Sequence, residues 1–328
     1  MDDLSREIRS LARAVGADMV GFAPVERFDT GPRQTHPNYY MKRARSVVVI
    51  GIGYPRSIGE VWGTYAEEGG LIAPYMWFGF AYLNWELSRV ALNVAKVLES
   101  HGYRSLPIPF SFTTQYRYFE SFDKTGQYLG DFSHKHAALA AGLGTFGWSN
   151  LFLTPEYGAR QRLISVITEA PLDAGELMDS QELCKPDVCG YACVETCPIG
   201  ALSKDEAQEF TMDGRTLRYA ALDHHRCRWC LDGFTEGSGS RTHLEPPERI
   251  TQEDFARAEE KRHLADRGLF ANAYVDFCGK CMHQCPSPEF EYLPQPIERF
   301  QGRTGCRHLP RPDTPPRVPS KAAPKRGR

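Results

Sequence analysis

The chain has 328 residues, a net charge of −2 at pH 7 and 41% hydrophobic residues. This length suffices for two domains with a sizeable core, and the near-neutral charge creates no global field for nucleic acid. The first residues, MDDLSREIRSLARAV, have neither the basic and apolar regions of a secretory signal nor a twin-arginine pair. The longest apolar run, near Val47–Gly53, is too short to span a bilayer. We therefore expect a cytoplasmic protein without a membrane partner.

Hydrophobic periodicity predicts the elements of the first half. Leu4 begins a helix with one apolar face and Asp2 or Asp3 as its N-cap, and Ser46–Gly53 is apolar throughout, as in a strand buried on both faces. Phe80–Ser100 has the strongest helical period. In chain order, the predicted segments are helices at residues 4–15, 80–100 and 133–143, and strands at 19–22, 46–53, 105–109, 150–154 and 161–168.

The second half begins after a predicted linker near residues 171–180. Helical segments are predicted at Ile199–Phe210 and Gln252–Ala265, and from Leu309 the chain is Pro-rich and basic, which predicts disorder. The order of elements predicts an α+β fold with a separate cysteine-rich module. The predicted organisation is a first domain at 1–175, the cysteine-rich domain at 176–308 and a disordered tail at 309–328.

Nine of the ten cysteines lie between Cys184 and Pro286, and two of their runs end in Cys-Pro. The runs are Cys184-x4-Cys189-x3-Cys193-x3-Cys197-Pro198 and Cys278-x2-Cys281-x3-Cys285-Pro286. A run closed by Cys-Pro is typical of bacterial ferredoxin modules, in which the last cysteine ligates the other [4Fe–4S] cluster. The sequence therefore predicts two clusters with crossed ligands.

Two such clusters need about eight thiolates. The first three cysteines of run one with Cys285 make one set, and Cys197, Cys278 and Cys281 make three quarters of the other. The last thiolate would come from Cys227 or Cys230, and we favour Cys227, which leaves Cys230 and Cys306 spare. The predicted ligands are Cys184, Cys189, Cys193, Cys197, Cys227, Cys278, Cys281 and Cys285.

Disulfides and a zinc site are the two alternative uses of these cysteines. A disulfide scaffold suits short secreted chains rather than this one. A zinc site could form from the Cys-x2-Cys pairs at 227/230 and 278/281. The two Cys-Pro endings favour iron–sulfur, although the wide x4 and x3 spacings of run one depart from the usual x2-x2-x3 pattern.

The stretch AAGLGTFGWSNLFLTPEYGARQRLISVITEAPL (Ala140–Leu172) resembles the cobalamin-dependent reductive dehalogenase family. The related epoxyqueuosine reductases share its Ala-Gly-Leu-Gly turn and the cysteine runs. The resemblance implies a nitroreductase-like α+β domain that binds cobalamin base-off, next to a ferredoxin-like domain with two [4Fe–4S] clusters. In that family electrons pass through the clusters to cobalt, which acts on a substrate bond.

The resemblance also implies the residues that would hold cobalamin. Its glycines permit positive φ and close approach to a flat ligand, although helix capping explains Gly142 or Gly144 equally well. The implied residues are Ala141, Gly142, Gly144, Gly147, Ser149 and Asn150.

The implied proton donor is a tyrosine beside a cation. A tyrosine with a pKa of about 10 is a poor acid at neutral pH unless a cation lowers that value. The aromatic segment at 110–131 is either such a functional loop or a covering loop, and it supplies Tyr116, Tyr118 and Tyr128. Arg160 and Arg162 are the cationic candidates, and they face one side if they lie on a strand.

These features predict an oxidoreductase that cleaves a carbon–halogen or similar bond of a small organic molecule. It would take electrons from a low-potential donor such as ferredoxin or flavodoxin. The chain lacks the helical repeat with which some epoxyqueuosine reductases grip tRNA, and their Asp-x-x-Pro pattern, so nucleic acid is not the expected partner. The alternatives are a tRNA-modifying epoxide reductase, for which the basic tail speaks, and an electron-transfer or cobalamin-handling protein.

Overall fold

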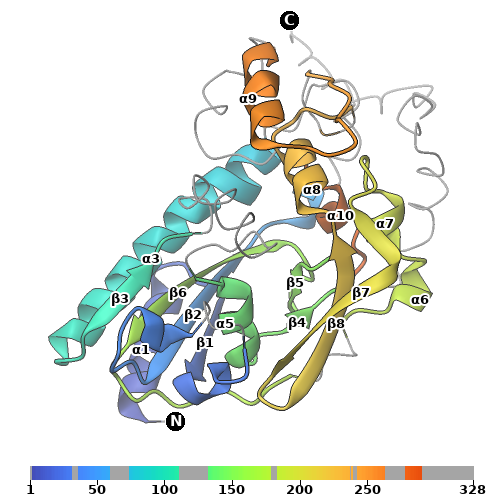
Figure 1. The fold of residues 1–328 in the computed structure, drawn as a ribbon. Coiled ribbons are helices and arrows are strands. Elements are labelled where there is room, and N and C mark those ends of the chain that lie inside the picture. Colours follow the sequence, from blue (N-terminus) through green and yellow to red (C-terminus); the bar gives the residue numbers. More distant parts are fainter. Residues whose placement is uncertain are drawn as a thin grey trace, which may run out of the picture.

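The computed structural model describes residues 2–31, 36–59, 74–110, 132–178, 183–236, 238, 242–262 and 278–289. These residues form a mixed α+β structure, in which a sheet flanked by helices lies beside a long hairpin and several short helices (Figure 1). Tyr116, Tyr118, Tyr128, Cys306 and the predicted tail lie outside the described residues.

A four-stranded antiparallel sheet forms the centre of the first half, with strand order β1-β2-β6-β3. Strands β2 and β6 have the predicted bounds. Strand β2 is a short apolar run buried by neighbours on each side, whereas β6 mixes polar and apolar residues and is buried mainly over residues 164–168. In their register Gly53 lies opposite Gln161, which brings the residues after β2 next to those before β6. The strands are β1 (Met19–Pro24), β2 (Ser46–Gly53), β3 (Ser105–Ile108) and β6 (Gln161–Thr168).

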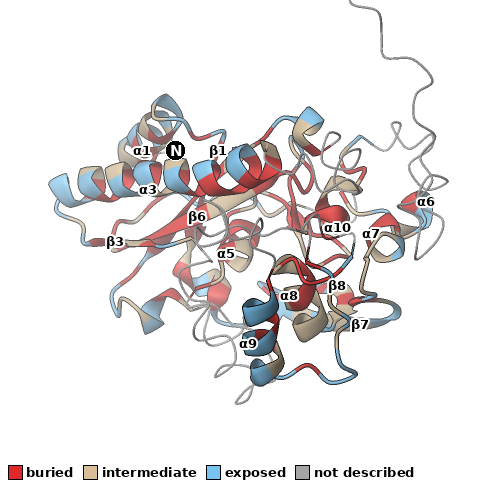
Figure 2. Ribbon diagram, turned by 90° about the horizontal axis from the view of Figure 1, so that it is seen from above, coloured by how far each residue is buried: buried red, intermediate tan, exposed pale blue. Residues whose placement is uncertain are grey.

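The sheet separates two hydrophobic cores, because successive strand residues face opposite sides. Val48 and Ile50 of β2 pack with α1 (Asp3–Ala14) and α3 (Tyr82–Ser100) in one core. Val47 and Val49 pack on the other face, with α5 (His134–Ala140) and the hairpin described below. Figure 2 shows α3 with one buried face toward the sheet and one exposed face.

The two long helices follow the predicted pattern. Asp2 caps α1 by accepting a hydrogen bond from the backbone N–H of Ser5. The predicted 80–100 helix is divided, because a π-helix, η5 (Tyr75–Ala81), precedes α3. Beyond the end of α3, Gly102 has a φ of 86°, in the left-handed region that glycine adopts without strain.

The helix predicted at Ile199–Phe210 is wrong. This part of the chain forms β7 (Leu202–Met212), which pairs antiparallel with β8 (Arg215–Leu222). Its Ala, Glu, Gln and Lys residues favour a helix locally, but cross-strand pairing overrides that propensity. The turn between the strands has positive φ at Asp213 (49°) and Gly214 (73°), so the Asp-Gly pair was the available hairpin signal.

The remaining elements are short. Thr251 and Asp254 form a capping box that begins α9, as predicted for a helix starting at Gln252. None of the described helices is both long enough and apolar enough to cross a bilayer. The elements are η1 (Val25–Phe28), η3 (Pro37–Tyr39), β4 (Thr145–Phe146), β5 (Phe152–Leu153), α6 (Pro186–Cys189), α7 (Ala192–Glu195), α8 (His224–Leu231), α9 (Gln252–Lys261) and α10 (Lys280–His283).

His134 joins α5 to the sheet and is expected to make stability depend on pH. Its ring nitrogens lie 2.9 Å from Ser165 Oγ and 2.9 Å from the Pro109 carbonyl oxygen, which as an acceptor requires a proton on Nε2. Burial lowers the pKa of His134 to about 4, so the unfolded chain takes up a proton first as the pH falls. Stability is therefore complete above about pH 6.5 and falls by about 3 kcal/mol between about pH 6.5 and 4.

The measurement is urea unfolding of the wild type and of His134→Gln at several pH values between 7 and 4. We expect the variant to be less stable at pH 7 and to lose less stability as the pH falls. Equal losses in the two proteins would contradict the assignment, since other buried histidines are common to both.

Candidate functional site

The first cysteine run is folded into two short helices, α6 and α7, that meet at a tight reversal. Gly190 and Tyr191 both have positive φ, 60° and 58°. This reversal explains the wide spacing of the run, because it brings Cys189 at the end of α6 close to Cys193 in α7. Tyr191 packs its ring edge-on against that of Trp148, with centroids 5.5 Å apart.

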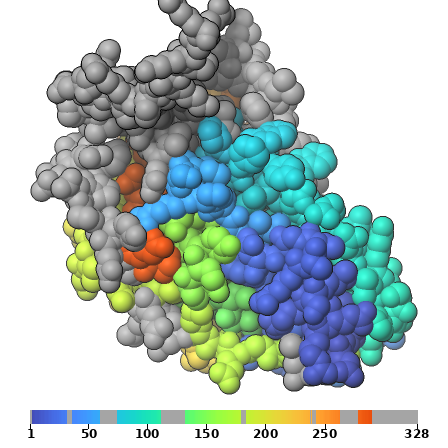
Figure 3. All heavy atoms as spheres, turned by 180° about the vertical axis from the view of Figure 1, so that it is seen from behind, coloured from blue at the N-terminus to red at the C-terminus, as the bar shows by residue number. Residues whose placement is uncertain are grey.

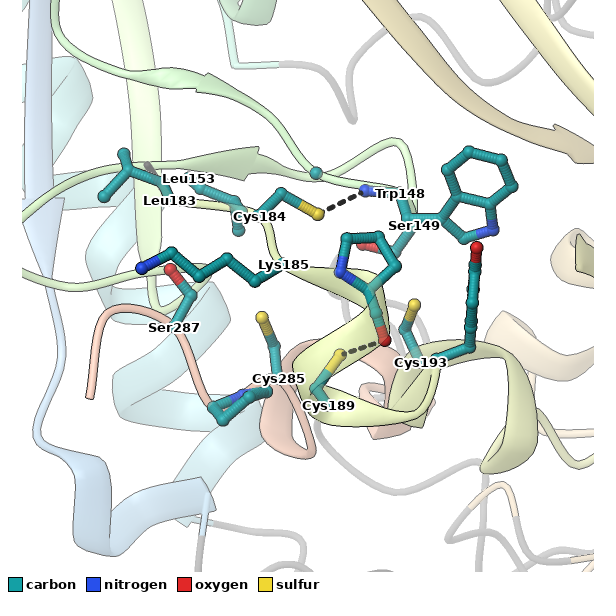
Figure 4. Close-up of a pocket in the computed structure, with 14 residues that line it drawn as sticks. Trp148, Ser149, Leu153, Leu183, Cys184, Lys185, Cys189, Cys193, Cys285 and Ser287 are labelled. Atoms are coloured by element: carbon teal, nitrogen blue, oxygen red, sulfur yellow. Dashed lines mark hydrogen bonds between the residues drawn. The ribbon is translucent and has the colours of Figure 1, made fainter. Parts of the chain in front are cut away.

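Four cysteine side chains from both runs line one small pocket (Figure 4). Gly147, Trp148 and Ser149 line it as well, so the glycine-rich turn of the first half borders the cysteine segment. The four are Cys184, Cys189, Cys193 and Cys285, the set predicted for one centre.

The thiols of this first group interact with one another. Burial raises the pKa of the Cys193 thiol, and Cys285 adds to the rise. Burial likewise raises the pKa of Cys184, against the effect of the Trp148 backbone N–H, which donates to the Cys184 sulfur at 3.2 Å. Four neighbouring thiols that are buried or half-buried favour a positively charged centre among them, because without it each thiolate destabilises the next one.

The other sulfurs form a second group of five. A hydrogen bond with Cys278 raises the pKa of Cys230, and burial and the neighbouring thiols act in the same direction. Burial raises the pKa of Cys281, with further contributions from Cys278 and Cys227. The Cys197 sulfur accepts a hydrogen bond from the Ala201 N–H at 3.2 Å. The five are Cys197, Cys227, Cys230, Cys278 and Cys281, so Cys227 and Cys230 both remain candidates for the last ligand.

The two groups have the donor chemistry of iron–sulfur sites. Nine cysteines of the described chain are free thiols, and backbone N–H groups point at a sulfur in each group. No three Cys, His, Asp or Glu side chains in the described ranges are close enough to ligate one metal ion. A [4Fe–4S] centre does not need that closeness, because each thiolate binds a different iron.

The glycines implied for cobalamin have local roles in the fold. A Cβ on Gly142 would lie 1.9 Å from the Glu176 carbonyl oxygen, and one on Gly144 would lie 1.9 Å from that of Leu153. Backbone of the same chain therefore fills the space beside both glycines. Gly147 lines the cysteine pocket, and Ala141 is buried in the core beneath the sheet.

Ser149 and Asn150 differ in their surroundings. Ser149 is buried and lines the cysteine pocket. Asn150 binds a half-buried lysine: its carbonyl oxygen and Oδ1 accept hydrogen bonds from Lys135 Nζ at 2.7 and 3.0 Å. Burial lowers the pKa of Lys135 to about 8, while the Cys227 thiol acts against that shift. A role of these residues in binding cobalamin stays a prediction.

The two candidate arginines lie on the same side of the sheet edge but in different environments. The Arg162 guanidinium stacks on the Phe80 ring at 4.1 Å and its Nε donates to Asn84 Oδ1 at 3.2 Å. Arg160 is buried, with 7% of its surface exposed. The described tyrosine beside both is Tyr54, at the end of β2, which sequence reasoning did not select. The only feature of the sequence that could have indicated Tyr54 is its position, since it places a phenol hydroxyl directly after the buried strand β2.

The segment that carries Cys285 packs against the first half of the chain. Gly158, with a φ of 56°, allows contact with the Ser287 carbonyl oxygen, which would lie 1.8 Å from a Cβ at that position. Arg56 pairs with Glu289 in the same segment. Figure 3 shows residues 278–289, in orange, next to green and light-blue parts of the first half. The first sulfur group therefore lies where the two halves meet.

No family model matches this chain. By sequence it is similar to curated epoxyqueuosine reductases. It is 22% identical to that of Bacillus subtilis over 223 residues, which cover 61% of this chain and 51% of the relative. It is 27% identical to that of Listeria monocytogenes over 174 residues, which cover 52% of this chain and 39% of the relative. The chain thus spans about half the length of the Bacillus relative and less of the Listeria one.

Among solved structures, a variant of the catabolic reductive dehalogenase NpRdhA matches with a TM-score of 0.50 and 18% identity. The match covers 83% of this chain and 36% of the dehalogenase. At that identity the likeness concerns the fold alone. The comparisons relate the chain to epoxyqueuosine reductases by sequence and to a reductive dehalogenase by fold, and the proteins named in both are reductases.

Proposed function

We propose that this chain is an iron–sulfur- and cobalamin-dependent reductase that cleaves a carbon–heteroatom bond. The observation that carries the proposal is the gathering of cysteines from two distant runs into two groups of neighbouring thiols. The first group would hold one [4Fe–4S] cluster, and four of the second group would hold another. When bound, the clusters would supply single electrons and cobalamin would supply the reactive metal.

The chain's own residues would position these groups and exclude water. Leu153, Leu183 and Met282 bury the first sulfur group from one side. Trp148 donates its backbone N–H to Cys184 and would stabilise the negative charge on that sulfur. Support for cobalamin comes from the resemblance of Ala140–Leu172. Gly142 and Gly144 add none, because backbone of the same chain fills the space beside them.

Two substrate classes follow from the two kinds of relative. The sequence motifs led us to a small organic molecule, such as an organohalide. The curated relatives favour the second candidate, an epoxide in a modified tRNA, because their printed name is epoxyqueuosine reductase. The two candidates differ in the bond that is cleaved, so one turnover assay distinguishes them.

The test is anaerobic purification followed by reconstitution with iron, sulfide and cobalamin. We expect about eight irons per chain and corrinoid absorbance that persists through gel filtration. The loaded protein is then given a reductant with either a brominated hydroxybenzoic acid or tRNA that contains epoxyqueuosine. Release of bromide would select the first substrate class, and conversion of the nucleoside would select the second. Iron without bound corrinoid would remove cobalamin from the proposal, and absence of iron would remove the whole of it.

A further inference from the structure

The buried Tyr54 hydroxyl is a hydrogen-bond donor for which the described residues supply no acceptor. The side chain is 2% exposed, and its hydroxyl has no hydrogen-bond partner in the part of the chain that the structure describes. Burial raises the pKa of Tyr54 and outweighs the nearby Arg160 and Arg162, so the group stays protonated at neutral pH. An unsatisfied buried hydroxyl costs about 1–3 kcal/mol, which indicates that an acceptor belongs to this site.

Arg160 lies next to Tyr54 and is also buried. The Tyr54 backbone N–H donates to the Arg160 carbonyl oxygen at 3.1 Å. The nearest carboxylate that acts on Arg160 is that of Glu289, which is already paired with Arg56. Across the described ranges, no carboxylate lies within ion-pair distance of Arg160. A buried guanidinium without a carboxylate is costly, and it calls for an anion.

The anion that this pair faces is indicated by its neighbours. The ring of Tyr54 lies edge-on to that of His283, two residues before Cys285, with centroids 6.2 Å apart. The turn that precedes Arg160 is in backbone contact with the residues that follow Cys285, through Gly158 and Ser287. Tyr54 also belongs to the hydrophobic cluster against which Cys184 and Cys285 pack. Tyr54 and the turn before Arg160 therefore lie beside the segment that carries Cys285.

We propose that Tyr54 and Arg160 form a two-donor site for the iron–sulfur centre that Cys285 would help to bind, and that together they raise its reduction potential. This inference rests on the proposed function. The four thiolates outweigh the positive charge of a [4Fe–4S] core, so the centre is an anion and becomes more negative on reduction. A cation and a hydroxyl donor buried beside it stabilise the reduced form more than the oxidised form. Reduction adds one electron from an external low-potential donor, and no bond or proton changes place.

The experiment is a redox titration of the full-length, anaerobically reconstituted protein, followed by electron spin resonance. The variants are Tyr54→Phe, which removes only the hydroxyl, and Arg160→Met, which removes the charge and keeps the length. Tyr103→Phe is the matched control, because Tyr103 packs against a different cluster from the one that contains Tyr54 and contacts Cys285. Iron content is measured for each protein first.

We expect full iron content and a lower midpoint potential for one of the two centres in both variants. For Arg160→Met the equilibrium constant for reduction should fall about tenfold, equivalent to about 59 mV for a one-electron couple. The second centre and Tyr103→Phe should not shift. If Arg160→Met loses iron, its potential cannot be compared with that of the wild type, and the potential of Tyr54→Phe alone tests the inference.

Two results would overturn the inference in different ways. Unshifted potentials with normal iron content would reject this site while leaving the iron–sulfur proposal in place. If turnover then fell in the same variants, the pair would serve the substrate instead of the centre. Absence of any iron–sulfur signal in the wild type would reject the proposed function itself.

Discussion

Replacing Cys285 by serine should lower the iron content of the reconstituted protein from about eight to about four per chain. Cys285 belongs to the second run in sequence, yet it lines the pocket with three cysteines of the first run. Its loss should therefore remove the same centre that Cys189→Ser removes. Serine lacks the soft sulfur donor that iron prefers, and three thiolates hold a cluster less well than four.

The comparison between variants makes this expectation specific. Spin resonance spectra of Cys285→Ser and Cys189→Ser should match, and both should differ from that of Cys281→Ser, which belongs to the other group. The control is Cys306→Ser, a cysteine that neither proposed set uses, and it should keep full iron. If Cys285→Ser matched Cys281→Ser instead, each run would hold its own centre and crossed ligation would be wrong.

Replacing Gly158 by alanine should separate the Cys285 segment from the first half of the chain. The added Cβ would meet the Ser287 carbonyl oxygen at 1.8 Å, and the φ of 56° disfavours any side chain there. Backbone must move to relieve this contact, so we expect a loss of about 3 kcal/mol or more in the free energy of unfolding. Iron at the first centre should be lost more rapidly to a chelator.

The matched control for this variant is Gly214→Ala. Gly214 has a φ of 73° and nothing within 4 Å of an added Cβ, so only the conformational strain remains. That strain should cost about 1–2 kcal/mol and should leave the rate of iron loss unchanged. Denaturant unfolding and the rate of iron release to a chelator are the two measurements. Equal effects of the two substitutions would mean that the contact with Ser287 does not hold the segment.

Several parts of the fold could be predicted from local sequence. Ser46–Gly53 and Gln161–Thr168 have the predicted bounds. The first was predictable because a strand buried on both faces needs a continuous apolar run. The start of α1 was predictable from Asp2, whose side chain can cap only the first turn. The grouping of Cys285 with the first run was predictable from the two Cys-Pro endings, because in two-cluster ferredoxins the cysteine before the proline ligates the other cluster.

Other parts depend on contacts between distant residues. Residues 202–212 have helical propensity, and only their pairing with 215–222 makes them a strand. The proximity of Tyr54 to Arg160 follows from the register of β2 and β6, in which Gly53 lies opposite Gln161. No local pattern contains that register. Tyr116 and Tyr118 were predicted because they lie in a segment rich in aromatic residues. Tyr54 follows a buried strand, and the residues around it have no unusual composition.

The crossed arrangement of the sulfurs has a consequence for biosynthesis. Under the proposed ligation, three thiols of the first centre leave the ribosome about one hundred residues before the fourth, Cys285. During that interval the nascent chain presents an incomplete set of reactive thiols, open to adventitious metal ions and to oxidation. We therefore expect iron–sulfur delivery to follow translation, at a stage when the late segment has already reached its place beside Gly158.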